Sequence, residues 1–217
     1  MKKKKECRHK SPPQTGVSRR EFLSAAGVGT LGVAAAGTLV GTERVIAEPA
    51  ANLIEPTELV PITLRINARE HKLLVEPRWS LLFVLREKLG MTAAKPGCER
   101  GECGSCTVLM GEQPRYSCMT LALEAAHTEI TTLEGLMDGE DLGPVQEAFV
   151  ECDGYQCGYC TPGQVMSVEG LLRTNPDPST EEIRLGVSGN LCRCGAYPNI
   201  FKAAKRAGEI KRTGGES

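Results

Sequence analysis

Three cysteines and three glycines fall within residues 97–108, whose sequence is Gly97-Cys98-Glu99-Arg100-Gly101-Glu102-Cys103-Gly104-Ser105-Cys106-Thr107-Val108. A loop that brings three sulfur atoms together has to wrap tightly, and glycine permits the positive φ angles and close backbone approach that such wrapping needs. Backbone N–H groups exposed along the loop can then donate hydrogen bonds to negatively charged sulfur. The segment therefore predicts a site at which cysteine sulfurs converge.

The spacing of these cysteines indicates an iron–sulfur cluster. Cys98, Cys103 and Cys106 follow the pattern Cys-x4-Cys-x2-Cys, and Cys118 comes after eleven further residues. This is the plant-type ferredoxin spacing for a [2Fe–2S] cluster. Zinc is the main alternative, but zinc sites favour short Cys pairs or mixtures of Cys and His. None of the three histidines in the chain is suitably spaced within a cysteine group.

A second group consists of Cys157-x2-Cys160 and, after 31 intervening residues, Cys192-x-Cys194. By spacing alone it is less specific, because Cys-x2-Cys also opens many zinc and redox sites. Each pair is expected near a helix terminus, where free N–H groups stabilise an anionic cluster. We predict a second [2Fe–2S] cluster on these four cysteines. A disulfide framework is disfavoured for both groups, since cysteines so close in sequence seldom bridge without strain.

The hydrophobic pattern predicts strands around the first cysteine group and helices around the second. Strands are expected at 61–67, 72–75, 107–110 and 129–132, with turns at 67–70 and 111–113. Ser80 can cap a helix that Gly90 ends. Further helices are expected at 144–150, 164–173, 180–187 and 198–207. Aromatic residues make up only 4% of the chain, so a bound metal would help to stabilise a thin core.

The beginning of the chain has the order of an export signal. A basic leader precedes Ser18-Arg19-Arg20-Glu21-Phe22-Leu23, an apolar run covers 25–40, and Val45-Ile46-Ala47 ends the segment with small residues. The twin arginine in this context predicts a Tat signal at 1–47, and hence export of the folded chain to the periplasm. A membrane anchor is the alternative, but a stable span needs about 20 strongly apolar residues. Residues 48–58 are expected to form a linker.

The charge of the chain argues against a polyanionic partner. Of 26 Lys and Arg and 27 Asp and Glu residues, nine basic and three acidic ones lie within 1–47, so the remainder carries 17 basic and 24 acidic residues and a net charge of −7. Nucleic acids and anionic membrane surfaces attract basic proteins. We therefore expect neither as a partner.

Two further motifs surround the second cysteine group: Gln156-Cys157-Gly158-Tyr159-Cys160-Thr161-Pro162-Gly163 and Gly189-Asn190-Leu191-Cys192-Arg193-Cys194-Gly195. Together with residues 97–108, and in this order, they resemble the small iron–sulfur subunit of the molybdenum hydroxylases, the xanthine oxidase family. With the Tat leader, the chain is most similar to the periplasmic aldehyde oxidoreductase type. The resemblance implies an α+β fold, with a β-grasp plant-type ferredoxin domain at 59–136, an all-α four-helix [2Fe–2S] domain at 137–210 and a tail at 211–217.

The resemblance also implies cofactors and partners. A large partner subunit would hold molybdenum–molybdopterin cytosine dinucleotide and catalyse the reaction, and another partner would often hold FAD. By position in the family motifs, Gln156 and Cys194 would approach the pterin. The chain itself would supply no catalytic residue and would pass electrons from the molybdopterin site to a flavin or another acceptor. Cys152 matches no family ligand and is expected to be a buried helix cysteine.

Two other functions stay open at this stage. The chain could be a free-standing two-cluster electron carrier, although a simple carrier would need only the first domain. It could also be a zinc-stabilised binding module without redox activity.

Overall fold

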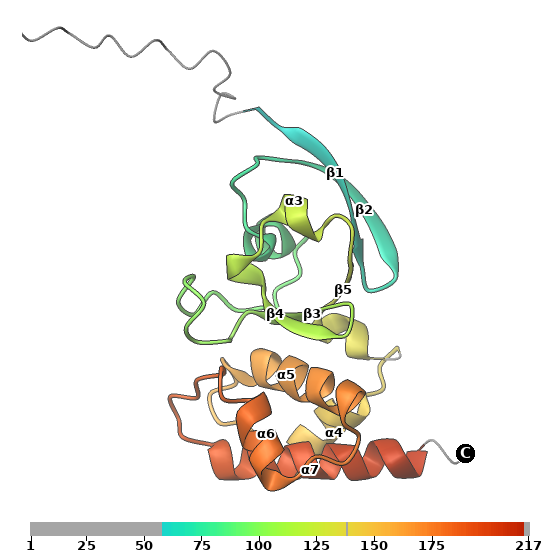
Figure 1. The fold of residues 1–217 in the computed structure, drawn as a ribbon, viewed down its shortest axis with the longest axis vertical. Coiled ribbons are helices and arrows are strands. Elements are labelled where there is room, and N and C mark those ends of the chain that lie inside the picture. The colour runs from blue at the N-terminus through green and yellow to red at the C-terminus, as the bar shows by residue number, and fades with distance from the viewer. Residues whose placement is uncertain (1–57, 138, 215–217) are drawn as a thin grey trace, which may run out of the picture. The chain divides into compact units, whose positions relative to one another are not determined.

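The computed structural model describes residues 58–137 and 139–214, which belong to one compact unit (Figure 1). The predicted Tat signal at 1–47 and all but the last residue of the predicted linker at 48–58 lie outside the described residues. Within the described part, no helix is both long and apolar enough to cross a membrane.

A mixed five-stranded sheet forms the first part of the fold, with the strand order β2-β1-β5-β3-β4. Its strands are β1 (Val60–Ile66), β2 (Arg69–Val75), β3 (Thr107–Met110), β4 (Gln113–Tyr116) and β5 (Glu129–Thr131). β1 and β5 run parallel, whereas the pairs β1–β2, β3–β4 and β3–β5 are antiparallel. The strands predicted from the alternating pattern are therefore present.

Both hairpin turns are shorter than predicted. Asn67 and Ala68 alone connect β1 to β2, and both have positive φ angles, of 51° and 62°. Met110 pairs with Gln113, so the second turn is only Gly111 and Glu112. Two-residue turns with positive φ match the twist of antiparallel strands. Residues at 69–70 and 113, which the sequence placed in turns, consequently belong to strands.

The helix predicted after Ser80 begins as expected and then widens. The hydroxyl of Ser80 accepts a hydrogen bond from the N–H of Phe83 at 3.2 Å and so caps α2 (Leu81–Phe83). The chain continues as the π-helical turn η1 (Val84–Lys88), in which the N–H of Leu89 donates to the carbonyl of Val84 at 3.1 Å. Gly90, at a φ of +70°, ends the element. The wider turn keeps the apolar side of the segment buried against the sheet.

The remaining elements connect or follow the strands. Three short ones lie beside the sheet: η2 (Ser117–Met119), α3 (Ala122–Ala125) and η3 (Leu133–Leu136). The four helices expected beyond residue 139 are α4 (Pro144–Glu151), α5 (Thr161–Thr174), α6 (Thr180–Gly186) and α7 (Tyr197–Gly214). α7 runs seven residues beyond its predicted end at 207 and includes residues 211–214 of the predicted tail. Lys211 and Arg212 form ion pairs there with Glu169 and Asp177, which stabilise the last turns.

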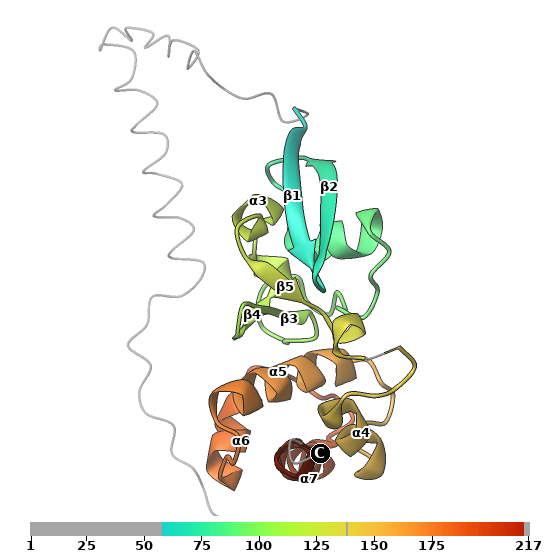
Figure 2. The same ribbon diagram turned by 90° about the vertical axis from the view of Figure 1, so that its right-hand side faces the viewer.

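Two hydrophobic cores occupy the two parts of the fold. One lies between the sheet and the segment α2–η1, and the other lies among α4, α5, α6 and α7. α5 packs against β3 and β4 on one side and against the other helices on the other, as Figure 2 shows. Its residues from Pro162 to Gly170 are all buried. α5 therefore joins the two cores.

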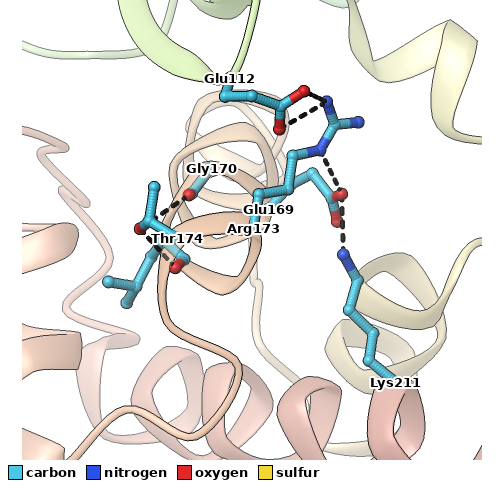
Figure 3. Close-up of polar contacts among 7 residues, drawn as sticks. Glu112, Glu169, Gly170, Arg173, Thr174 and Lys211 are labelled. Atoms are coloured by element: carbon cyan, nitrogen blue, oxygen red, sulfur yellow. Dashed lines mark hydrogen bonds and ion pairs between the residues drawn. The ribbon is translucent and has the colours of Figure 1, made fainter.

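A charged network connects the same parts (Figure 3). Glu169 on α5, whose side chain is only 9% exposed, accepts hydrogen bonds from Arg173 at 2.9 Å and from Lys211 of α7 at 2.8 Å. Arg173 also lies 3.4 Å from the carboxylate of Glu112 in the β3–β4 turn. The network thus links the sheet, α5 and α7.

Candidate metal centres

The first cysteine loop is curled by residues with left-handed backbone. Gly101 and Gly104 have φ angles of +79° and +67°, and Glu99 adopts +55°. This curvature directs backbone N–H groups inward, and the N–H of Glu102 lies 3.3 Å from the sulfur of Cys98. The local structure agrees with the prediction that glycine allows the loop to wrap around its sulfurs.

The four cysteines of the first group come together as two pairs. The thiol of Cys98 lies near that of Cys103, and the thiol of Cys118 lies near that of Cys106. β3 begins directly after Cys106, and β4 runs back along it in the antiparallel direction. Cys118 follows β4 and is therefore returned to the cysteine loop. The backbone between them is fixed by the hydroxyl and N–H of Ser117, which both donate to the carbonyl of Cys106.

The four cysteines of the second group also form two pairs. Cys157 contacts Cys194, and Cys160 contacts Cys192, in both cases through the thiols. Cys160 is the N-cap residue of α5, so the sequence correctly placed one pair at a helix terminus. The other pair precedes α7, and its backbone is held by Tyr197, whose hydroxyl accepts a hydrogen bond from the N–H of Cys192 at 2.9 Å.

The environment shifts the pKa of the thiols in opposite directions within each group. The backbone N–H of Arg100, helped by that of Glu102, lowers the pKa of Cys98 to about 7. The N–H of Tyr159 and then the thiol of Cys194 lower the pKa of Cys157. Burial, followed by the contact with the paired cysteine, raises the pKa of Cys118 and of Cys160 to about 12. Metal binding requires thiolates, so loading these sites would release protons from the buried thiols.

The arrangement of sulfurs in pairs fits a two-iron cluster. Across the described ranges, no three Cys, His, Asp or Glu side chains surround a single point where one metal ion could sit. Each iron of a [2Fe–2S] cluster takes two cysteine thiolates. The nine cysteines of the described residues are free thiols, so the alternative of a disulfide framework is not realised among them.

The two cysteine groups lie close together. A hollow of about 390 Å³ is lined by members of both, Cys103 from the first and Cys157, Cys160 and Cys192 from the second. The hydroxyl of Tyr159 donates to the carbonyl of Pro96 across it, at 3.2 Å. Sequence spacing could not predict this adjacency, because it depends on contacts between residues more than 50 positions apart.

The predicted pterin contacts, Gln156 and Cys194, are both exposed. Exposed apolar side chains lie close to them in the sequence, with Tyr155 41% and Leu191 55% accessible. Cys152 was expected to be a buried helix cysteine, but it is the C-cap residue after α4 and is only partly buried, where it packs against the helical core. Sequence reasoning missed Asn190, although it lies in a quoted motif. This asparagine is 3% exposed and hydrogen-bonded to both cysteine-bearing parts of the chain.

Comparison with known proteins places these features in a family context. Residues 132–205 match the family described as [2Fe-2S] binding domain. The chain is 39% identical over 216 residues to the aldehyde oxidoreductase iron-sulfur-binding subunit PaoA of Escherichia coli K12, with 92% of each chain covered. It is 43% identical over 150 residues to the nicotinate dehydrogenase small FeS subunit of Eubacterium barkeri, covering 69% of this chain and 96% of that one.

Solved structures give the same result. Quinoline 2-oxidoreductase from Pseudomonas putida 86 contains a chain that aligns with a TM-score of 0.69 at 42% identity, covering 73% of this chain and 99% of that one. Aldehyde oxidoreductase from Desulfovibrio gigas aligns with a TM-score of 0.68 at 37% identity, covering 71% of this chain but 17% of that longer one. The mixed sheet with packed helices is thus the fold of iron–sulfur subunits and domains in such enzymes.

Proposed function

This chain belongs to the iron–sulfur subunits of the xanthine oxidase family of molybdenum hydroxylases, and we propose that it performs electron transfer on two [2Fe–2S] clusters. One cluster would be held by Cys98, Cys103, Cys106 and Cys118, and the other by Cys157, Cys160, Cys192 and Cys194. The observation that carries this assignment is that four thiols lie near one another in each group. Each bound cluster would accept and release one electron at a time.

The chain's own residues determine how well such clusters would be held. Backbone N–H groups of the first loop, such as that of Glu102, would donate to cluster sulfur and thereby raise the reduction potential. Burial of Cys106 and Cys192 would keep water away from one side of each cluster. We assign no residue of this chain to the chemistry of substrate oxidation.

We also propose that the fold has two domains, a β-grasp ferredoxin domain at 59–136 and a four-helix domain at 137–210. Their separate hydrophobic cores, and the close packing of α5 on β3 and β4, support this division. Each domain would carry one cluster. The contacts across α5 would then hold the two clusters at a fixed separation.

The partner assignment follows from exposure of the second cysteine group. A large subunit holding molybdopterin cytosine dinucleotide would dock over Gln156 and Cys194, which are exposed, as are Tyr155 and Leu191, apolar residues nearby in the sequence. A flavin subunit or another acceptor would receive electrons from the first cluster. Similarity to PaoA over 92% of the chain supports aldehydes as the substrate class of the complex. The twin-arginine motif at Arg19 and Arg20 supports a periplasmic location after Tat export.

Metal analysis of the natively purified complex tests the proposal. The complex would be isolated anaerobically through a C-terminal tag on this chain, and iron, molybdenum and zinc would be measured. About four irons per chain, together with molybdenum and a large partner, are expected. Four irons without molybdenum would instead favour a free-standing carrier, and a colourless zinc protein would refute the cluster assignment. Aldehyde-dependent reduction of an artificial acceptor by the complex then tests the substrate class.

A further inference from the structure

The side chain of Asn190 connects the two cysteine-bearing parts of the chain. Its Nδ2 donates to the carbonyl oxygen of Gly104 at 2.9 Å and to the hydroxyl of Thr107 at 3.3 Å. Its Oδ1 accepts a hydrogen bond from the hydroxyl of Ser167 on α5 at 2.8 Å. Gly104 directly follows Cys103, and Asn190 lies two residues before Cys192. The buried amide of Asn190 therefore connects the chain next to Cys103, in the first group, with the chain next to Cys192, in the second group.

Backbone contacts on both sides of Asn190 continue this connection. The N–H of Leu191 donates to the carbonyl of Cys103 at 2.9 Å. The hydroxyl of Tyr116, on β4, donates to the carbonyl of Gly189 at 3.1 Å. The carbonyl of Asn190 itself accepts from Nε2 of Gln164 at 2.9 Å. We call residues 103–107 and 189–191, with Tyr116, Gly163, Gln164 and Ser167, the interloop seam.

Glycines allow the backbones of the seam to touch. A Cβ on Gly104 would overlap both the carbonyl of Gly189 and the amide of Asn190. A Cβ on Gly163 would overlap the carbonyl of Gly104. No side chain separates the two loops at these points, so small changes in the seam displace cysteine-bearing backbone directly.

We propose that Asn190 is a positioning residue that fixes the separation and relative orientation of the two clusters. This inference rests on the proposed function, since it requires both cysteine groups to hold clusters. Asn190 is 3% exposed, and its amide oxygen is the acceptor for the buried hydroxyl of Ser167. Loss of the amide removes that acceptor and the direct bond to the carbonyl of Gly104, which then keeps only the hydrogen bonds from the N–H and hydroxyl of Thr107. The loop at 188–191 would lose its side-chain anchor to the first cysteine loop, which favours its movement toward water.

The separation of the clusters has a spectroscopic readout that does not depend on turnover. Two clusters that are each reduced by one electron are paramagnetic, and their magnetic dipolar interaction falls with the inverse cube of the distance between them. A loop that carries Cys192 and Cys194 and has lost its anchor would hold its cluster at a larger and more variable distance. The expected result is a weaker and more broadly distributed interaction.

The experiment compares the wild-type complex with Asn190→Ala by EPR of the fully reduced, tag-purified protein. Asn67→Ala is the control, because the amide of Asn67 also donates and accepts side-chain hydrogen bonds, two in all and both with Thr132, but lies away from the cysteines. The inference predicts a reduced interaction in Asn190→Ala and an unchanged one in Asn67→Ala. An interaction of wild-type strength in an Asn190→Ala complex that retains both clusters would overturn it.

Two milder variants decide the question if Asn190→Ala loses a cluster. Tyr116→Phe and Ser167→Ala each remove one seam hydrogen bond and leave the rest of the side chain in place or nearly so. A reduced interaction in both supports the inference, and a wild-type interaction in both overturns it. A wild-type complex that shows only one cluster would refute the proposed function itself, which is a different outcome from an unchanged interaction in the variants.

Discussion

Removal of the Glu169 carboxylate should destabilise the fold far more than removal of an exposed carboxylate such as that of Glu209. The side chain of Glu169 is 9% exposed and accepts hydrogen bonds from Arg173 at 2.9 Å and Lys211 at 2.8 Å. Figure 3 shows it between the two cations. Glu169→Ala would leave both cations without this partner, although Arg173 keeps its weaker contact with Glu112.

The size of the effect follows from burial and exposure. Hydrogen bonds to charged groups contribute about 1.5–3 kcal/mol each, so two of them set an upper range of roughly 3–6 kcal/mol. The side chains of Arg173 and Lys211 are 27% and 26% exposed, so water can replace part of what they lose. We therefore expect Glu169→Ala to cost about 2–3 kcal/mol, and Glu169→Gln, which keeps the shape and one acceptor, about half as much.

Urea denaturation of the full chain, monitored by circular dichroism, measures this loss of stability. Wild type and variant are compared in the same cluster-loaded state. At an m-value of about 2 kcal/mol/M, the midpoint should fall by about 1 M in Glu169→Ala. Glu209→Ala is the control, because Glu209 pairs with Arg206 at 3.4 Å but is 44% exposed. Exposed pairs contribute about 0–1 kcal/mol. A midpoint in Glu169→Ala no lower than that of Glu209→Ala would refute the role of the network.

Three other predictions follow from the sites and their surroundings. Cys194→Ser should remove the EPR signal of the second cluster and turnover of the complex while leaving the signal of the first; full activity would contradict the ligand assignment. Gly163→Ala should destabilise the chain by about 1–3 kcal/mol in urea titrations, because the added methyl overlaps the carbonyl of Gly104, whereas the same change at a free helix position stabilises. Hydrogen bonds from Ser179 lower the pKa of Glu182, so its contribution to stability is present above the unfolded pKa and is lost as pH falls through the folded pKa. The difference in urea midpoint between wild type and Glu182→Gln should therefore shrink in acid, and a pH-independent difference would refute this.

Local chemistry explains why much of the fold could be predicted from the sequence. Alternating apolar residues in β1, the hydroxyl cap at Ser80 and the proline at the start of α4 act on their immediate neighbours, and each appears where expected. The widened turn at Val84–Lys88 could not be foreseen, because its apolar spacing also suits a regular α-helix. The extension of α7 to Gly214 depends on ion pairs to Glu169 and Asp177, which are distant in sequence.

The same distinction applies to the candidate sites. Spacing explains why cysteines two to five residues apart on the glycine-rich loops lie together, whereas the approach of Cys118 to the first loop and of Cys192 and Cys194 to Cys157 and Cys160 depends on the fold. Their division into pairs was not predictable, because Cys157 pairs with Cys194 and not with its neighbour Cys160. Which cysteine lies beside Cys157 depends on the direction from which the segment before α7 approaches the N-terminus of α5.

The relation between the two cysteine groups is the least local feature and the one with most consequence for electron transfer. Gly104 and Gly189 could each be explained by a turn in its own loop, and Gly163 lies in the first turn of α5, yet a Cβ at each position would meet an atom from another segment of the chain. Gly189 illustrates this, because its added methyl would overlap the hydroxyl of Tyr116, which donates to the carbonyl of the same residue. The glycines and Asn190 thus serve one purpose together: the former allow two loops to approach at backbone distance, and the latter satisfies the polar groups that this approach buries. If that is correct, replacing a seam glycine and replacing Asn190 should not have additive effects on stability, since either change already separates the loops. A Gly163→Ala/Asn190→Ala double variant whose destabilisation equals the sum of the two single ones would show that the contacts act independently.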